Sequence, residues 1–506
     1  MAEPAASAPS APKQRSATDV NQDVATQSAQ LSRSLRNVLW LSTGSVLTRA
    51  MNLARGIVLA RLLTPFDFGV YGLGGSIVGI KEKFADIGAG TFLVYRPRQV
   101  AEHTETAFWV NLGLSTSLLA ILAALAPLLA RLYREPLLSP VLVILALGIW
   151  ARTNSSIHQS LLRTQSRFRA MAVIDYCGSG AWLAVAVLLA WKGFGVWALA
   201  VSATVANTAA AVLFVTTQGW RPRFRISKAS FRLLGGFSFW YLGQGLAWFL
   251  VGNLDNLLVG RFLGMTLLGI YALAFNYALF PVTMIGNAIG SVAYAELPWL
   301  YDRPQAFWSA YREFSRVLAL AGCGAAFAAV VAAPEIFPLV FGHKWDAAIV
   351  PFQILSVYAA MRCLWLDPFL AMGNFRLSSL MGVFAVAAAA AAIWFGMRFG
   401  LAGVACAMLA IQMGFDVAAV LVTMRSWRKL TDLARATTPY LAGAVLAALL
   451  ALACRRLALA GGVELKIGIF ALTLGVYGCI YGLLFRSDLA RVLGHLLDRQ
   501  VKGGEG

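Results

Sequence analysis

The sequence predicts an all-α integral membrane protein with about fourteen transmembrane helices. Of its 506 residues, 59% are hydrophobic and 13% are charged, and the mean hydropathy is +0.70. In soluble domains about a quarter of the residues are charged, so this composition is typical of a membrane protein. The apolar runs continue for about twenty residues, as in membrane-spanning helices, whereas strands of an outer-membrane barrel alternate with period two.

The expected spans follow one another with short, charged or turn-like separators, so no loop is long enough to form a separate domain. Residues 1–30 are rich in Ala, Ser, Pro and Gln and lack an apolar core, which indicates a disordered tail and not a signal peptide. The approximate span limits are 37–60, 67–94, 107–130, 137–160, 170–191, 194–217, 233–258, 266–290, 316–340, 347–371, 377–397, 401–424, 437–458 and 465–485.

The distribution of basic residues predicts the orientation. With the N-terminus in the cytoplasm, 26 of the 42 Lys and Arg residues lie in cytoplasmic segments, 10 lie in segments on the opposite side, and the rest lie inside spans. Lys and Arg collect in cytoplasmic loops, so both termini are expected in the cytoplasm. The net charge of +19 is explained in this way, and no nucleic-acid partner is expected.

One phrase occurs twice. The stretch "IVLARLLTPFDFGVYGLG" at 57–74 aligns with "LLVGRFLGMTLLGIYALA" at 257–274, and both join two expected spans. Six spans separate the copies, so equivalent helices point the same way, which predicts two six-helix lobes related by a pseudo-twofold axis along the membrane normal. The identical pairs are Arg61 and Arg261, Leu63 and Leu263, Gly69 and Gly269, Tyr71 and Tyr271, and Leu73 and Leu273.

The repeat divides the chain. We expect a disordered cytoplasmic tail at 1–35, an N-lobe at 36–220, a C-lobe at 221–430, two further spans at 431–486 and a cytoplasmic tail at 487–506. Arg61 and Arg261 fall at the elbows between spans and are expected at the periplasmic rim, not as substrate ligands.

Charged residues inside the spans are the candidate functional groups. Each costs about 2.5–3.5 kcal/mol at a helix centre, so each should face a cavity or a partner. A self-neutralising polar face at 81–86 and snorkelling of one arginine remain the structural alternatives. The candidates for substrate binding are Arg49, Arg55, Lys81, Lys83 and Arg362. The candidates for a gate or ion coupling are Asp255, Glu82, Asp86 and Asp416, the last on one helix face with Gln412.

The repeat places Arg55 in register with Asp255. Equivalent positions lie at similar depth across a pseudo-twofold axis, so we predict that the two approach each other as a gate or a cavity-lining pair. The alternative is that helices near each residue satisfy its charge.

Several kinds of site have no support in the sequence. The six cysteines lie in apolar runs without a CxxC pair, and the four histidines are far apart, so neither a metal nor a disulfide frame is expected. No nucleotide-binding motif occurs, and no cofactor is expected. A membrane enzyme would need a large periplasmic loop or a cluster of His, Asp and Glu, so the chain is not expected to be an enzyme.

Four landmarks in order resemble the polysaccharide-transporter branch of the multidrug/oligosaccharidyl-lipid/polysaccharide (MOP) superfamily. The resemblance covers about residues 33–485, and the triplet "KEK" at 81–83 departs from the family pattern. The landmarks are "LARLLTPFDFGVYGLGGSIVG" with "FADIGAG", "LLRTQSRFRAMAVIDY", "GFGVWALA" with "WRPRFRISKASFRLL", and "FPLVFGHKWDAAIVPFQIL".

The resemblance implies a Wzx-type flippase that moves undecaprenyl-diphosphate-linked oligosaccharides to the periplasmic leaflet. It implies two six-helix lobes with two extra helices, and a cationic central cavity to which Arg49 and Arg55 correspond. The implied partners are the lipid-linked oligosaccharide and the bilayer, with polysaccharide polymerase or export machinery as a further partner. The alternative is a cation-coupled small-molecule (multidrug) exporter of related architecture.

Overall fold

The computed structural model describes residues 51, 53–85, 100–165, 167–224, 243, 245–300, 302–366, 375–424, 427–460 and 466–485. Every regular element in these ranges is helical. The long helices are α2 (Pro65–Ala85), α4 (Val100–Tyr133), α5 (Leu138–Asn154), α6 (Ser156–Thr164), α7 (Phe168–Trp191), α8 (Val196–Gln218), α10 (Leu254–Phe262), α11 (Met265–Glu296), α12 (Pro304–Ile336), α13 (Ile349–Arg362), α15 (Phe375–Gly396), α16 (Gly400–Met424), α17 (Trp427–Ala460) and α18 (Lys466–Leu484). The short ones are η2 (Leu297–Leu300), η3 (Phe337–Phe341), η4 (His343–Ala348) and η5 (Met397–Phe399).

The all-helical membrane fold predicted from the sequence is confirmed. Within the described ranges, eight helical segments are long and apolar enough to cross a membrane, and one of them, Leu377–Thr423, covers most of α15 and most of α16. The number fourteen and the lobe boundaries at 220 and 430 stay predictions. Both expected tails, at 1–35 and 487–506, lie outside the described residues.

Two expected spans have different limits in the structure. The expected span 137–160 is divided at Ser155, whose hydroxyl donates to the carbonyl oxygen of Arg152 at 2.8 Å and satisfies a group at the end of α5. Inside the expected span 347–371, α13 ends at Arg362, and residues 363–366 are not helical. A charged residue predicted in mid-helix therefore lies at a helix C-terminus.

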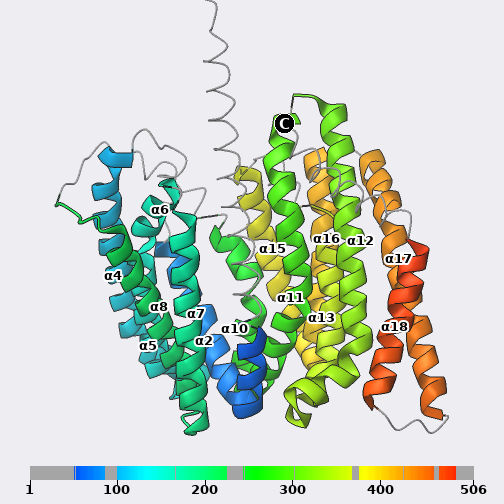
Figure 1. Ribbon diagram of the computed structural model, residues 1–506, viewed down its shortest axis with the longest axis horizontal. Helices are drawn as coiled ribbons and strands as arrows, with labels where there is room; N and C mark the ends of the chain where they lie inside the picture. Colours follow the sequence, from blue (N-terminus) through cyan, green and yellow to red (C-terminus); the bar gives the residue numbers. More distant parts are fainter. Residues whose placement is uncertain are drawn as a thin grey trace, which may run out of the picture.

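The helices form two groups (Figure 1). The helices α4 to α8 lie on one side, α11 to α18 lie on the other, and α2 and α10 lie between them. The packing pattern repeats, because α8 packs on α5 and α7 while α16 packs on α13 and α15. We call these groups the first bundle, which includes α2, and the second bundle, which includes α10; α17 and α18 pack on the second bundle through α12.

The repeated phrase forms the crossing between the bundles. A Cβ atom at Gly69 would collide with the carbonyl oxygen of Met265, and one at Gly269 would collide with that of Pro65. The two contacts are reciprocal, with a constant offset of 200 residues, as a twofold relation between the halves requires. Only glycine permits this close approach of the backbones of α2 and α11.

The buried core has one part that both bundles share and two parts that each belong to one bundle. One cluster of buried side chains contains residues of both bundles and extends from the elbows, at Leu63 and Trp345, along α2 as far as Val78. A second cluster contains only residues of the second bundle, and a small third cluster only residues of α6, α7 and α8. Among the described residues, the bundles are therefore packed together at the elbow end.

Candidate functional site

The elbow end is held by hydrogen bonds between the bundles. The ammonium of Lys344, in η4, donates to the carbonyl oxygens of Arg61 at 2.9 Å and Leu63 at 2.6 Å. The indole Nε1 of Trp345 donates to the carbonyl oxygen of Ala60 at 2.9 Å, and the ring of Trp345 packs edge-on against Phe68 at 5.2 Å. The helical segment 53–62 is thus bound directly to the junction that follows α12.

Arg61 also links the bundles, because its side chain donates from the first bundle to backbone carbonyls of the second. Its Nε donates to the carbonyl oxygen of Val340 at 2.8 Å, and its Nη2 donates to that of Leu339. These carbonyls lie in η3, a π-helical turn that Gly342 ends with a φ of +93°, so a cation here satisfies acceptors at a helix C-terminus. We call the set of donors Arg61, Lys344 and Trp345, with their acceptors, the elbow latch.

The repeat equivalent of Arg61 in the second bundle does not form a second latch within the described part of the chain. Arg261, the repeat equivalent of Arg61, lies over the ring of Phe262 at 5.5 Å and within electrostatic range of Tyr133 at the end of α4. Among the described residues no hydrogen bond from its guanidinium reaches the first bundle. Partial desolvation of the ammonium lowers the pKa of Lys344, an exposed residue, and the nearby Asp67 carboxylate offsets part of this shift.

Arg55 lies about 10 Å further along the helix from the elbow. Its guanidinium carbon is 3.8 Å from the centre of the Trp182 ring on α7, and the hydroxyls of Tyr71 and Tyr277 lie within electrostatic range. Tyr277 belongs to α11, so groups from both bundles surround this cation. A guanidinium stacked on indole keeps its charge at low desolvation cost.

Asp255 is only 1% exposed and has partners in its own bundle. The hydroxyl of Tyr271 donates to its Oδ2 at 2.8 Å, and the backbone N–H of Asn256 donates to its Oδ1 at 2.8 Å. The predicted approach of Arg55 and Asp255 is therefore wrong for this conformation. The repeat gives each charge a tyrosine 16 residues later, Tyr71 or Tyr271, and these aromatic partners take the place of the opposite charge.

A short polar bridge joins the bundles next to this carboxylate. The Ser76 hydroxyl on α2 donates to Oδ1 of Asn253 at 3.2 Å, and Nδ2 of Asn256 donates to the Ser76 oxygen at 3.2 Å. These bonds are uncharged and near the upper length limit for such bonds, so they are easily exchanged for water.

The cations of α2 lie about 25 Å from the elbow, near the far side of the hydrocarbon layer. Lys81 is 5% exposed, and its Nζ has no hydrogen-bond partner among the described residues. Lys83 is half-buried and Glu82 is exposed, so the triplet does not form one shared face. Asp86, and Arg49 on the preceding segment, lie outside the described residues.

Arg362 and Asp416 lie at a similar depth in the second bundle, about 20–25 Å from the elbow. Nη1 of Arg362 donates to the Tyr358 hydroxyl at 3.4 Å, and Asp416 on α16 lies within electrostatic range of the guanidinium. The Gln412 amide donates to Oδ1 of Asp416 at 2.8 Å, so these two share a helix face as predicted. The structure thus places Arg362 and Asp416 within electrostatic range of each other, whereas Arg55 lies among aromatic side chains.

Sequence reasoning missed the tyrosines and the latch. Tyr71 and Tyr271 are among the identical residues of the repeat, and their constant spacing from Arg55 and Asp255 is a signal that identifies them as partners. No comparable signal marks Lys344, because its acceptors are backbone carbonyls.

Comparison with known proteins gives a family match. Residues 58–350 match the family described as polysaccharide biosynthesis protein. The lipopolysaccharide biosynthesis protein WzxC of Escherichia coli is 23% identical over 336 residues, which cover 65% of this chain and 68% of WzxC. The succinoglycan biosynthesis transport protein ExoT of Rhizobium meliloti is 27% identical over 259 residues, covering 51% of this chain and only 52% of ExoT.

Solved structures share the fold. The lipid II flippase MurJ, in an inward closed conformation, superposes with a TM-score of 0.70 at 11% identity, covering 89% of this chain and 100% of that one. An inward-facing multidrug resistance MATE family transporter of the MOP superfamily gives 0.59 at 15% identity, covering 79% and 99%. With more than half of its length matched, this chain belongs to the polysaccharide biosynthesis protein family, and it has the fold of MOP-superfamily membrane transporters.

Proposed function

We propose that this protein is a flippase of the bacterial inner membrane, with both termini in the cytoplasm. Its substrate is an undecaprenyl-diphosphate-linked oligosaccharide, which it moves from the cytoplasmic to the periplasmic leaflet for polysaccharide synthesis. The observation that carries the proposal is the combination of a latched elbow end with cations at two depths inside the membrane. The names of relatives such as ExoT and the fold shared with MurJ support it.

The chemistry of the substrate explains the need for these cations. A diphosphate and its sugars cannot cross about 30 Å of hydrocarbon unaided. Guanidinium groups at Arg55 and Arg362 provide charge-assisted, bidentate hydrogen bonds to phosphate oxygens. Lys81, buried near the end of α2 with no hydrogen-bond partner among the described residues, adds a third positive charge. The polyprenyl tail stays in the bilayer between the bundles while the headgroup passes through.

Transport then proceeds by alternating access of the bundles. We place the elbow end on the periplasmic side, so that the elbow latch closes that end and the substrate enters from the cytoplasmic end. Release requires the latch and the crossing at Gly69 to separate. An ion gradient, acting through Asp255, Glu82, Asp86 or Asp416, or consumption of the product provides the free energy. Polysaccharide polymerase or export machinery would consume that product.

Deletion of the gene, followed by analysis of lipid-linked sugars on each face of the membrane, tests the function. We expect the intermediate to accumulate on the cytoplasmic face. Complementation with Arg49→Ala, Arg55→Ala or Arg362→Ala should fail although the variants insert normally, whereas Arg131→Ala, an exposed arginine at the end of α4, should restore transport.

The alternative function is cation-coupled export of small molecules. The fold shared with a MATE transporter is compatible with it. It predicts normal polysaccharide in the deletion strain and altered tolerance to drugs. That outcome would refute the flippase, and normal transport by all three arginine variants would refute the cationic cavity.

A further inference from the structure

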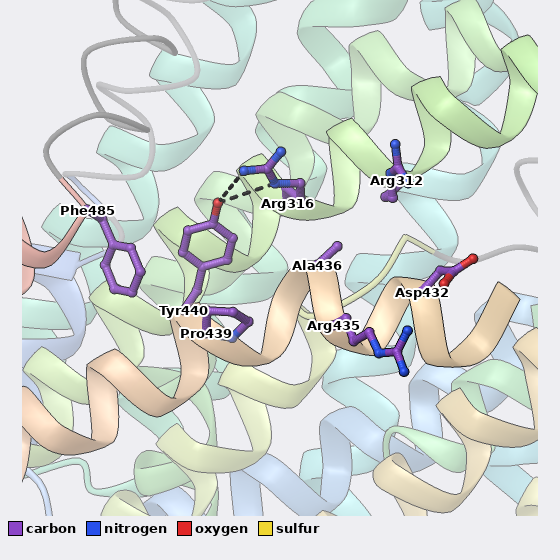
Figure 2. Close-up of a pocket in the computed structure, with 8 residues that line it drawn as sticks. All are labelled: Arg312, Arg316, Asp432, Arg435, Ala436, Pro439, Tyr440 and Phe485. Carbon is purple, nitrogen blue, oxygen red and sulfur yellow. Dashed lines mark hydrogen bonds between the residues drawn. The ribbon is translucent and has the colours of Figure 1, made fainter. Parts of the chain in front are cut away.

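A basic pocket lies on the second bundle, away from the interface between the bundles. It has a volume of about 490 Å³ and lies between the first half of α12, the first half of α17 and Phe485, which directly follows α18. Figure 2 shows Arg312 and Arg316 on one helix, Asp432, Arg435 and Tyr440 on the other, and Phe485 at one end. None of these residues belongs to the site described above.

The pocket has the composition of an anion site. Three arginines and one aspartate line it, so its formal charge is positive. Nη2 and Nε of Arg316 donate to the Tyr440 hydroxyl at 3.1 and 3.3 Å, which fixes the guanidinium in the pocket, and Nη1 lies 3.4 Å from Glu313. In the part of the chain that the structure describes, no carboxylate forms an ion pair with Arg312 or Arg435.

The position of the pocket along the helices selects the ligand. The helix α12 has 33 residues and α17 has 34, so each is about 50 Å long and exceeds the hydrocarbon layer by about 20 Å. The pocket residues lie within about 20 Å of the helix starts, at the boundary between hydrocarbon and water opposite the elbow end. Beyond it, α17 exposes Leu446, Leu449 and Leu450 by 49%, 61% and 43%, a surface suited to acyl chains.

We propose that this pocket binds the phosphate headgroup of an anionic phospholipid, whose acyl chains lie along the exposed leucines of α17. Arg312 and Arg435 contact the phosphate oxygens, and Arg316, held by Tyr440, provides a fixed third donor. Asp432 lowers the affinity and discriminates against headgroups that place a second anionic group near it. Basic pockets between membrane helices at this boundary bind anionic lipid headgroups in general.

The test uses the full-length protein, purified and measured by native mass spectrometry with phosphatidylglycerol, phosphatidylcholine and inorganic phosphate as separate ligands. The pocket variant is Arg312→Gln with Arg435→Gln, both exposed residues whose change leaves the helix packing intact. The control variant is Arg303→Gln with Arg428→Gln, which removes two exposed arginines from the same end of the same helices but outside the pocket.

The wild type should prefer phosphatidylglycerol to phosphatidylcholine, and the pocket variant should bind phosphatidylglycerol about 30-fold more weakly while the control variant keeps its affinity. Asp432→Asn should increase the affinity about fivefold, a gain that misfolding cannot produce. Equal losses in the pocket and control variants would overturn the proposal. Binding of inorganic phosphate as tight as that of phosphatidylglycerol would overturn the lipid assignment in favour of a soluble anion.

Discussion

Replacing Lys344 by methionine should shift the protein toward the state in which the elbow end is open. The methionine keeps the apolar part of the side chain and removes both hydrogen bonds from the ammonium to Arg61 and Leu63. Hydrogen bonds from charged donors contribute roughly 1.5–3 kcal/mol each, and the exposed position of Lys344 reduces this to roughly 1 kcal/mol each. The closed state should lose about 2 kcal/mol, which changes the ratio of closed to open protein by about 30-fold.

Spin labels at Lys192 and Phe399 measure this shift. Both residues are exposed at the elbow end, one in each bundle, so the distance between them increases when the latch opens. Double electron–electron resonance on the purified protein, with native cysteines replaced, should show a larger long-distance population in Lys344→Met. Arg131→Met, which removes an exposed cation at the same end, should leave the distribution unchanged. If both variants give the wild-type distribution, the latch does not hold the elbow end closed.

Three further changes test the packing and the buried groups. Gly69→Ala should destabilise the protein by about 1–3 kcal/mol in thermal unfolding, because its Cβ meets backbone, whereas Gly75→Ala, which faces open space, should be neutral or stabilising. Equal effects would contradict the close crossing. Tyr271→Phe should cost about 1–3 kcal/mol by leaving a buried carboxylate with one donor fewer, and an unchanged melting temperature would refute that role. Lys81→Met should raise the melting temperature and abolish transport, since a buried ammonium with no hydrogen-bond partner among the described residues destabilises the fold. A variant that is more stable and still transports would exclude Lys81 from the cavity.

The sequence was sufficient for the features that depend on periodicity and repetition. Continuous apolar runs predicted the helical membrane fold, and the repeated phrase placed Gly69 and Gly269 at equivalent points, where the backbones of α2 and α11 cross. The same register put Arg55 and Asp255 at similar distances from the elbows.

The partners of these charges could not be read in the same way. Opposite charge and equal register predicted a pair of Arg55 with Asp255. In the structure Arg55 stacks on an indole ring, and Asp255 accepts a hydrogen bond from a tyrosine hydroxyl. The latch depends on which carbonyls a π-helical turn at 337–341 leaves unpaired, and this is a property of the folded backbone and not of the residue types. The end of α13 at Arg362 could not be predicted either, because the apolar run continues beyond this residue.

The chemistry of the elbow latch has a consequence for how related sequences should vary. Arg61, Lys344 and Trp345 all donate to backbone carbonyl oxygens, so the side chains of acceptor residues such as Leu339 and Val340 contribute nothing to the bonds. If the closed state is under selection, the three donor residues should be conserved among related sequences, whereas the residue types at the acceptor positions should vary. Pairwise covariation, which reports contacts between side chains, would not detect the closure, although it joins residues nearly 300 positions apart.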